Sequence, residues 1–175
     1  MRDDNDLPEQ VVWEGRFIAA KRRGKWEYVS RTRNISAAAI LAIHEGEVIL
    51  VEQYRVPIQA QCLELPAGLI GDDGQDEEVE TAAIRELEEE TGYRADHMEQ
   101  LGRFHASPGM SSEGFTLLRA TGLTRVGEGG GVEGEDIIVH HVPLAEAAAF
   151  IERKRAEGCA IDVKLLLLLA SGWLA

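Results

Sequence analysis

Apolar runs in the first third of the chain have the short lengths typical of β-strands. Residues 11–33 contain several such runs around a turn near Arg23-Gly24, which predicts a small group of short strands. Two longer runs, 35–44 and 47–54, meet at the turn residues Glu45-Gly46. The second run is continuously apolar through its middle, so we expect this strand to be buried.

One segment has the pattern of an amphipathic helix. Residues 76–91 begin with acidic side chains, contain no Pro or Gly and stop before Gly92, which favours a helix with these ends. Within the segment, Val79, Ala83 and Leu87 recur every four residues and form one apolar stripe. This stripe predicts the face that packs on the core.

The rest of the chain alternates between strand-like and helix-like patterns. Residues 63–70 are punctuated by Pro and Gly, and we expect them to end in a loop over residues 71–74. A glycine-rich acidic loop covers 126–135, residues 143–157 have helical spacing, and the uniformly apolar run 163–169 predicts a buried C-terminal helix. Further strands are expected over 98–105, 114–122 and 136–142.

Strands combined with segregated helices predict an α+β protein, arranged as a three-layer α/β/α sandwich around a mixed sheet. The length of 175 residues suits one domain with a small appendage. We therefore expect an N-terminal β segment over residues 1–34 and a main domain over 35–175.

The formal net charge of −13 changes what the chain is expected to bind. It argues against non-specific binding to nucleic acid, which requires a basic face. It also means that an anionic substrate needs local neutralisation, and divalent cations are the obvious candidates.

The two cysteines, Cys62 and Cys159, do not form a CxxC pair, and we expect both to be free and buried. This is consistent with a reducing, cytoplasmic setting. The polar N-terminus has no apolar core of the signal-peptide kind, and the apolar run 165–170 is too short to cross a bilayer, so no membrane association is expected.

Carboxylates are clustered on the predicted helix. Glu86 and Glu90 are one helical turn apart on the same face, and Glu89 lies beside them. Their mutual repulsion destabilises the helix unless a cation resolves it, and Mg²⁺ prefers such an oxygen cluster. By residue type alone, however, a Glu-rich helix is more often a solvated surface.

The spacing of this segment resembles the box that defines the Nudix hydrolases. In words, the box is G, five residues, E, seven residues, R-E, an aliphatic, any residue, E-E, any residue, G and an aliphatic. Chance matches to seven fixed identities are expected at fewer than about one start position in ten million. Only Tyr93 departs, at a position typical of core packing. The matching residues are Gly71, Glu77, Arg85, Glu86, Leu87, Glu89, Glu90 and Gly92.

This resemblance implies a metal-dependent hydrolase that cleaves a nucleoside diphosphate linked to another moiety, using Mg²⁺ or Mn²⁺ and two or more ions per site. It implies metal ligands at Glu86 and Glu90, often with Glu89, and an Arg85 that orients these glutamates. Glu77 is implied to be structural or to support the ligands, and Gly71 to permit the loop that enters the helix.

Three other segments resemble the ADP-ribose pyrophosphatase branch of the family. In the Glu64–Gly68 segment, the resemblance implies that the carbonyl of Ala67 is a metal ligand. In 105–113, Ser107-Pro108-Gly109 and Glu113 match a substrate-binding turn of nucleoside diphosphate sugar hydrolases.

The third segment is the end of the glycine-rich loop. There Glu133 matches the catalytic base and Glu135 a further metal ligand, although the base assignment between these two glutamates stays open.

Binding residues outside the box are implied by the same branch. Trp26 matches an aromatic that stacks on the base, often across a dimer interface, and Arg31 is a candidate for contacting the base or a phosphate. Arg55 matches a phosphate-contacting arginine, for which a guanidinium fork is suited. The resemblance therefore implies a homodimer in which residues 1–34 serve dimerisation and base recognition.

The leading hypothesis is hydrolysis of ADP-ribose to AMP and ribose 5-phosphate. A GDP-mannose pyrophosphohydrolase is the alternative within the class, because the run Gly129–Glu133 also resembles that branch. A module that binds a nucleotide sugar without cleaving it is the alternative from another class, and the complete set of box glutamates argues against it.

Overall fold

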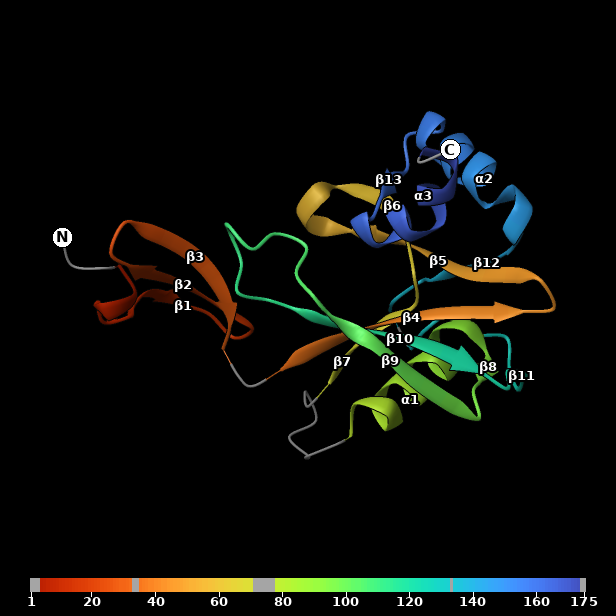
Figure 1. The fold of residues 1–175 in the computed structure, drawn as a ribbon, viewed down its shortest axis with the longest axis horizontal. Coiled ribbons are helices and arrows are strands. Elements are labelled where there is room, and N and C mark those ends of the chain that lie inside the picture. Colours follow the sequence, from red (N-terminus) through yellow and green to blue (C-terminus); the bar gives the residue numbers. More distant parts are fainter. Residues whose placement is uncertain (1–3, 33–34, 71–77, 133, 174–175) are drawn as a thin grey trace.

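The computed structural model describes residues 4–32, 35–70, 78–132 and 134–173. The N-terminal part folds into a small antiparallel sheet that lies to one side of the main body (Figure 1). A single 3-10 turn, η1 (Asp4–Asp6), precedes its three strands. The strands are β1 (Gln10–Glu14), β2 (Ile18–Arg23) and β3 (Trp26–Arg31).

A mixed eight-stranded sheet forms the main body. Its strand order is β13-β6-β5-β4-β10-β9, and in addition β12 pairs with β5 and β7 pairs with β4. β4 and β10 run parallel, whereas β9 and β10 are antiparallel. Its strands are β4 (Ser36–His44), β5 (Glu47–Arg55), β6 (Ala60–Glu64), β7 (Ala67–Ile70), β9 (His97–Phe104), β10 (Phe115–Thr121), β12 (Ile138–Pro143) and β13 (Ala160–Ile161). Beside it, β8 (Tyr93–Arg94) and β11 (Thr124–Arg125) form a two-stranded pair.

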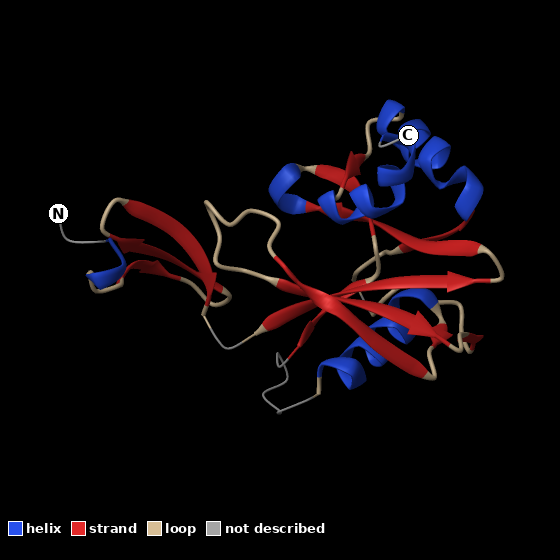
Figure 2. Cartoon of the chain, viewed as in Figure 1, coloured by secondary structure: helices blue, strands red, loops and turns tan. Residues whose placement is uncertain are grey.

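Helices cover both faces of this sheet, which gives the three layers expected from the sequence (Figure 2). The helix α1 (Val79–Thr91) lies on one face, and α2 (Ala147–Ala156) and α3 (Leu166–Trp173) lie on the other. Short 3-10 turns complete the chain at η2 (Val56–Ile58), η3 (Leu144–Glu146) and η4 (Val163–Leu165). Within the described residues, no helix is long and apolar enough to cross a membrane.

Two apolar clusters separate the layers. The predicted stripe on α1 packs as expected, because Ala83 and Leu87 are fully buried against β4 and β10 and Val79 joins them. Tyr93 is buried in the same cluster, which confirms that the departure from the box is a packing position. Cys62 and Cys159 are both free and buried, as expected.

Several element boundaries differ from the sequence expectations. Glu78 is extended, so α1 begins at Val79 rather than at residue 76. Within the Pro/Gly-punctuated segment 63–70, Pro66 lies between strands β6 and β7. The C-terminal helix is only half buried: Leu165 and Leu169 reach the core, while Leu166 and Leu167 are exposed. A uniformly apolar run cannot reveal which of its faces is covered.

The N-terminal sheet is joined to the main body through the connection between β9 and β10, which reaches toward it in Figure 1. The Val29 amide of β3 donates to the Met110 carbonyl at 2.9 Å, and the Ser112 amide donates to the Val29 carbonyl at 2.9 Å. Backbone pairing of this kind fixes the position of β3 relative to the segment that contains Pro108.

Candidate active site

The carboxylates of α1 lie at the edge of its buried face. Glu90 is only 5 % exposed, because it follows Leu87 around the helix toward the sheet. The Ala67 amide at the start of β7 donates a hydrogen bond to Glu90 Oε2 at 3.0 Å. The helix and β7 therefore bring together two residues that the sequence places 23 positions apart.

Burial raises the pKa of Glu90 to about 8. The Ala67 amide opposes this shift because it stabilises the charged form, while the negative charges of Glu86 and Glu135 add to it. The carboxylates of Glu86, Glu90 and Glu135 are therefore close enough to interact electrostatically. A divalent cation would remove both the repulsion and the penalty of burying a charge.

Gly68 makes room for Glu86. A Cβ at position 68 would collide with the Glu86 side chain, so only glycine leaves space for a carboxylate above β7. The sequence motif indicated a turn here but gave no sign of this contact, since residues 68 and 86 meet only when helix and strand pack.

Arg85 links the glutamates of the helix. Its guanidinium lies 3.0 Å from Glu86 Oε1 and 3.2 Å from Glu89 Oε2. Charge-assisted contacts of this kind restrict the rotamers of both carboxylates.

The glycine-rich loop is fastened to the C-terminus of α1. The Gly130 amide donates to the Glu90 carbonyl at 2.9 Å, and the Gly131 amide donates to the Glu89 carbonyl at 3.0 Å. These donors satisfy carbonyls that a helix end leaves unpaired. The loop is thereby held beside α1, and its Glu135 accepts a hydrogen bond from the Val132 amide at 2.9 Å. Glu133, Glu77 and Gly71 lie outside the described residues.

Arg55 forms a fork with a buried carboxylate. Its Nε and Nη2 donate to Glu64 Oε1 and Oε2 at 2.6 and 2.8 Å, and Glu64 is almost fully buried. The pKa of Arg55 is raised mainly by this pairing, and the charge of Glu90 contributes. The sequence pattern predicts no role for Glu64, because its pairing with Arg55 depends on the antiparallel register of β5 and β6.

A second group of predicted residues lies at the junction of the two sheets. Trp26 lines a cavity of about 390 Å³ together with Pro108 and Gly109. The Ser107 carbonyl closes this turn by accepting from the Met110 amide at 3.0 Å and from the Ser111 amide at 2.9 Å.

Arg31 and Glu113 also meet at this junction, with Arg31 Nε 2.6 Å from Glu113 Oε1. The predicted residues therefore form two neighbourhoods in the described chain. The first, around α1 and β7, contains Ala67, Arg85, Glu86, Glu89, Glu90, Glu135 and Arg55. The second, around β3 and the β9–β10 connection, contains Trp26, Arg31, Ser107, Pro108, Gly109 and Glu113.

The donor set of the first neighbourhood suits a hard divalent cation, because it consists of carboxylates and backbone oxygen. Within the described part of the chain, no three acidic, His or Cys side chains form a finished metal cage. In that part of the chain Glu86 contacts Arg85, Glu90 accepts from the Ala67 amide and Glu135 accepts from the Val132 amide.

Comparison with known proteins identifies the family of this chain. The model of the NUDIX domain family matches residues 32–157. The "Methanol dehydrogenase activator" of Bacillus methanolicus is 38 % identical over 87 % of this chain and 85 % of its own. The "ADP-ribose pyrophosphatase" of Bacillus subtilis (strain 168) is 35 % identical over the same shares of the two chains. The "GDP-mannose pyrophosphatase" of Cronobacter sakazakii is 36 % identical over 78 % of this chain and 72 % of its own.

A solved structure described as "Crystal structure of ADP compounds hydrolase" superposes with a TM-score of 0.68 at 28 % identity, over 83 % of this chain and 81 % of that one. The chain belongs to the NUDIX family. Its similarity to the Bacillus subtilis enzyme and to the solved structure confirms the predicted ADP-ribose pyrophosphatase branch, and the superposition confirms the predicted fold.

Proposed function

We propose that this protein hydrolyses the pyrophosphate bond of a nucleoside diphosphate sugar, with ADP-ribose cleaved to AMP and ribose 5-phosphate. One observation carries the proposal: Glu90 is buried beside Glu86 and Glu135 at the edge of β7, a cluster that suits the cations a diphosphate requires. The cavity beside Trp26 supports the nucleotide part of the substrate.

Glu86, Glu90, Glu135 and the Ala67 carbonyl would hold the proposed two or more Mg²⁺ or Mn²⁺ ions, and Glu89 would be a further ligand. When bound, such ions would neutralise the diphosphate and favour ionisation of a water molecule at neutral pH. Arg85 holds Glu86 and Glu89 in place. Glu133 is the proposed base, with Glu135 as the alternative.

Recognition is divided between phosphate and base. Arg55, held by Glu64, presents its remaining N–H groups to the phosphates, because its fork is already oriented by a buried partner. Trp26 stacks on the base in the cavity that Pro108 and Gly109 also line, Ser107 belongs to the same turn, and Glu113 in the adjoining cavity contacts the sugar.

Two alternatives are tested together with this proposal. Hydrolysis of GDP-mannose is favoured by the relatives that carry that activity in their names and by the run Gly129–Glu133. A binding module without catalysis is the other alternative.

The deciding experiment incubates the protein and Mg²⁺ with ADP-ribose, GDP-mannose, NADH, diadenosine polyphosphates and dGTP, and identifies the products. AMP and ribose 5-phosphate as the fastest products support the proposal. Faster release of GMP selects the first alternative, and nucleotide binding without turnover selects the second.

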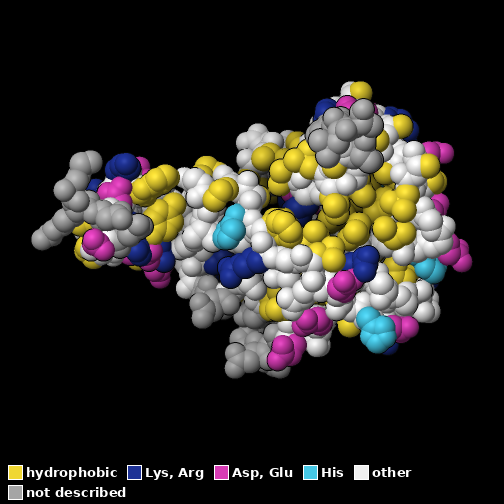
Figure 3. All heavy atoms as spheres, viewed as in Figure 1, with side chains coloured by type: hydrophobic (Ala, Val, Ile, Leu, Met, Phe, Trp, Pro, Cys, Tyr) yellow, Lys and Arg dark blue, Asp and Glu magenta, His cyan; other side chains and the backbone are white. Residues whose placement is uncertain are grey.

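We also propose a homodimer formed through the N-terminal sheet. Its strands and turns expose large apolar side chains that a single chain does not cover (Figure 3). The most exposed of these are Val11, Val12, Trp13 and Phe17. A second copy would bury them and would also approach the exposed side of Trp26. Sedimentation at micromolar concentration checks this, and a monomer would contradict it. The free cysteines support a cytoplasmic setting.

Replacement of Trp26 by alanine is expected to raise KM for ADP-ribose about ten-fold or more, because stacking on a base contributes roughly 1–3 kcal/mol. Trp26 is 49 % exposed, so the fold should tolerate the change. Steady-state kinetics measures the effect, and Trp26→Phe serves as the control because it keeps an aromatic face. An unchanged KM for Trp26→Ala would show that Trp26 does not bind the base.

A further inference from the structure

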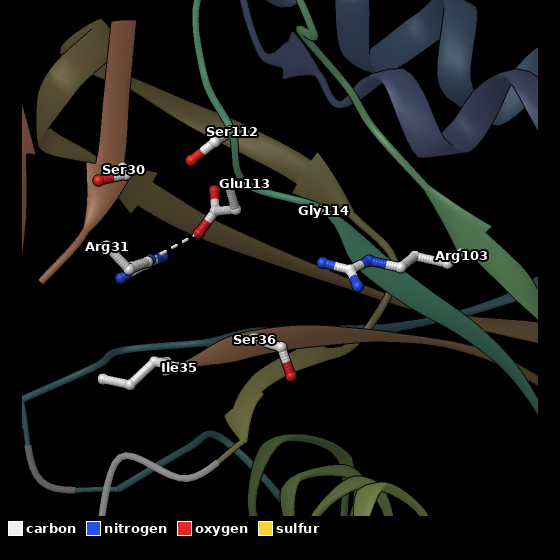
Figure 4. A pocket seen from close by; sticks show the side chains of 8 residues that line it. All are labelled: Ser30, Arg31, Ile35, Ser36, Arg103, Ser112, Glu113 and Gly114. Carbon is white, nitrogen blue, oxygen red and sulfur yellow. Dashed lines mark hydrogen bonds and ion pairs between the residues drawn. The ribbon is translucent and has the colours of Figure 1, made fainter. Parts of the chain in front are cut away.

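A polar cavity of about 310 Å³ lies between the N-terminal sheet and the main sheet (Figure 4). We call it the junction cavity. The lining residues that matter here are Ser30, Arg31, Ser36, Arg103, Ser112 and Glu113. Ser112 also lines the cavity that contains Trp26, so the two hollows adjoin.

The junction cavity carries a local positive charge in a chain of net charge −13. Two guanidinium groups and one carboxylate line it, which leaves one positive charge in excess. Figure 4 shows Arg103 extending into the cavity from one side and Arg31 on the other, where it pairs with Glu113, with Ser36 below. A cavity lined by guanidinium groups suits an anion that accepts charge-assisted hydrogen bonds.

Arg103 is the group that the protein leaves available. Glu113 pairs with Arg31, whereas Arg103 has neither an ion pair nor a hydrogen bond within the described part of the chain. An unpaired guanidinium at a polar hollow suits a ligand that supplies hydrogen-bond acceptors.

The register of the sheet places this cavity relative to the catalytic helix. Arg103 pairs with Thr116, Thr116 with Ala38, and Ala38 with Gly68, the residue that accommodates Glu86. Cross-strand partners share one sheet face, so Arg103 and Glu86 both lie on the α1 side. Three strand spacings separate Arg103 from Gly68, roughly 14 Å between backbones.

The ribose of a nucleotide that stacks on Trp26 lies next to its base, and the junction cavity adjoins the cavity that contains Trp26. We propose that this cavity is a phosphate subsite and that Arg103 selects substrates whose nucleoside ribose carries a phosphate monoester besides the diphosphate. This inference rests on the proposed function. Free phosphate presents the same dianion and is the other source of the ligand.

The first experiment is independent of catalysis. Binding of inorganic phosphate is measured by calorimetry in the presence of a chelator, so that no cation recruits phosphate to the carboxylates. We expect saturable binding that Arg103→Gln weakens about ten-fold or more, since two charge-assisted hydrogen bonds are lost. Arg119→Gln is the matched control, because Arg119 pairs with Glu99 on the opposite sheet face. No saturable binding, or equal binding by the Arg103 variant, would overturn the proposal.

The second experiment identifies the source. Turnover of ADP-ribose is compared with turnover of ADP-ribose that carries a phosphate on the 2′-hydroxyl of its adenosine. If the cavity binds the ribose phosphate of the substrate, Arg103→Gln lowers kcat/KM at least ten-fold for the phosphorylated compound and little for ADP-ribose. If both compounds respond equally to the variant, Arg103 does not select a ribose phosphate. If neither compound is cleaved, the proposed function is wrong. The calorimetric measurement of phosphate binding still tests whether the junction cavity is a phosphate subsite.

Discussion

Glu90→Gln is expected to lower kcat by about three orders of magnitude or more while the protein remains folded. Glutamine cannot ionise when a cation binds, so the variant removes a carboxylate ligand from the buried position near Glu86 and Glu135 and weakens both cation binding and activation of water. The fold should persist because the glutamine oxygen can still accept from the Ala67 amide.

The pH dependence of stability provides a second readout for this variant. The pKa of Glu90 is raised from 4.5 to about 8, so the folded protein holds this proton more tightly than the unfolded chain does. The resulting stabilisation is present at low pH and is lost as pH rises toward about 8. In chelator, Tm of the wild type should therefore fall relative to that of Glu90→Gln across this range.

Cation binding should also displace the Glu90 proton. Titration of the wild type with Mg²⁺ at neutral pH is therefore expected to release protons, and titration of Glu90→Gln to release fewer.

Glu88→Gln is the matched control for these measurements. Glu88 is on the same helix but pairs with Arg94 on the outer side, and the loss of such an exposed pair changes stability by less than about 1 kcal/mol. Its kcat should remain near that of the wild type. Retention of more than about a tenth of the activity by Glu90→Gln at saturating Mg²⁺ corresponds to under about 1.4 kcal/mol of barrier and would refute the assignment.

Local patterns were sufficient to predict the helix that carries the carboxylates. The spacing of Val79, Ala83 and Leu87 fixes which face of α1 is buried, and that face determines where Glu86 and Glu90 lie. Turns at Gly24 and Gly46 were predictable for a similar reason, since their glycines adopt positive φ angles between adjacent strands.

Contacts between distant segments were not predictable from these patterns. The fork between Arg55 and Glu64 requires the register of β5 and β6, and the space under Glu86 requires that β7 pack below α1. The junction cavity depends on β3 pairing with the β9–β10 connection. No local signal in the sequence distinguishes Arg103 from any other exposed arginine.

Gly129→Ala is expected to separate the glycine-rich loop from the catalytic helix. Gly129 has φ +73°, and a Cβ there would lie 2.5 Å from the Thr91 carbonyl carbon and 2.7 Å from the Glu90 carbonyl oxygen. These are backbone atoms of the last turn of α1, so they cannot rotate away as a side chain would. The strain of a non-glycine residue at this φ adds roughly 1–3 kcal/mol.

To relieve this clash the glycine-rich loop must move away from the end of α1, and the movement changes the positions of residues in the proposed active site. The amides of Gly130 and Gly131 would leave the Glu90 and Glu89 carbonyls, and Glu135 would move away from Glu90. We expect kcat to fall at least 100-fold and Tm to fall by roughly 3–10 °C, as a loss of this size implies for a chain of this length.

Gly127→Ala is the control in the same loop. Gly127 has no positive φ, and its added Cβ would lie 3.8 Å from the nearest atom, the Gly92 Cα, which is ordinary contact. Both variants add one methyl group within three residues of each other, so a general intolerance of the loop to alanine would affect them equally. The expected result is a loss of activity and Tm in Gly129→Ala alone. Equal kcat and Tm in the two variants would show that docking of the loop on α1 does not position Glu135 for catalysis.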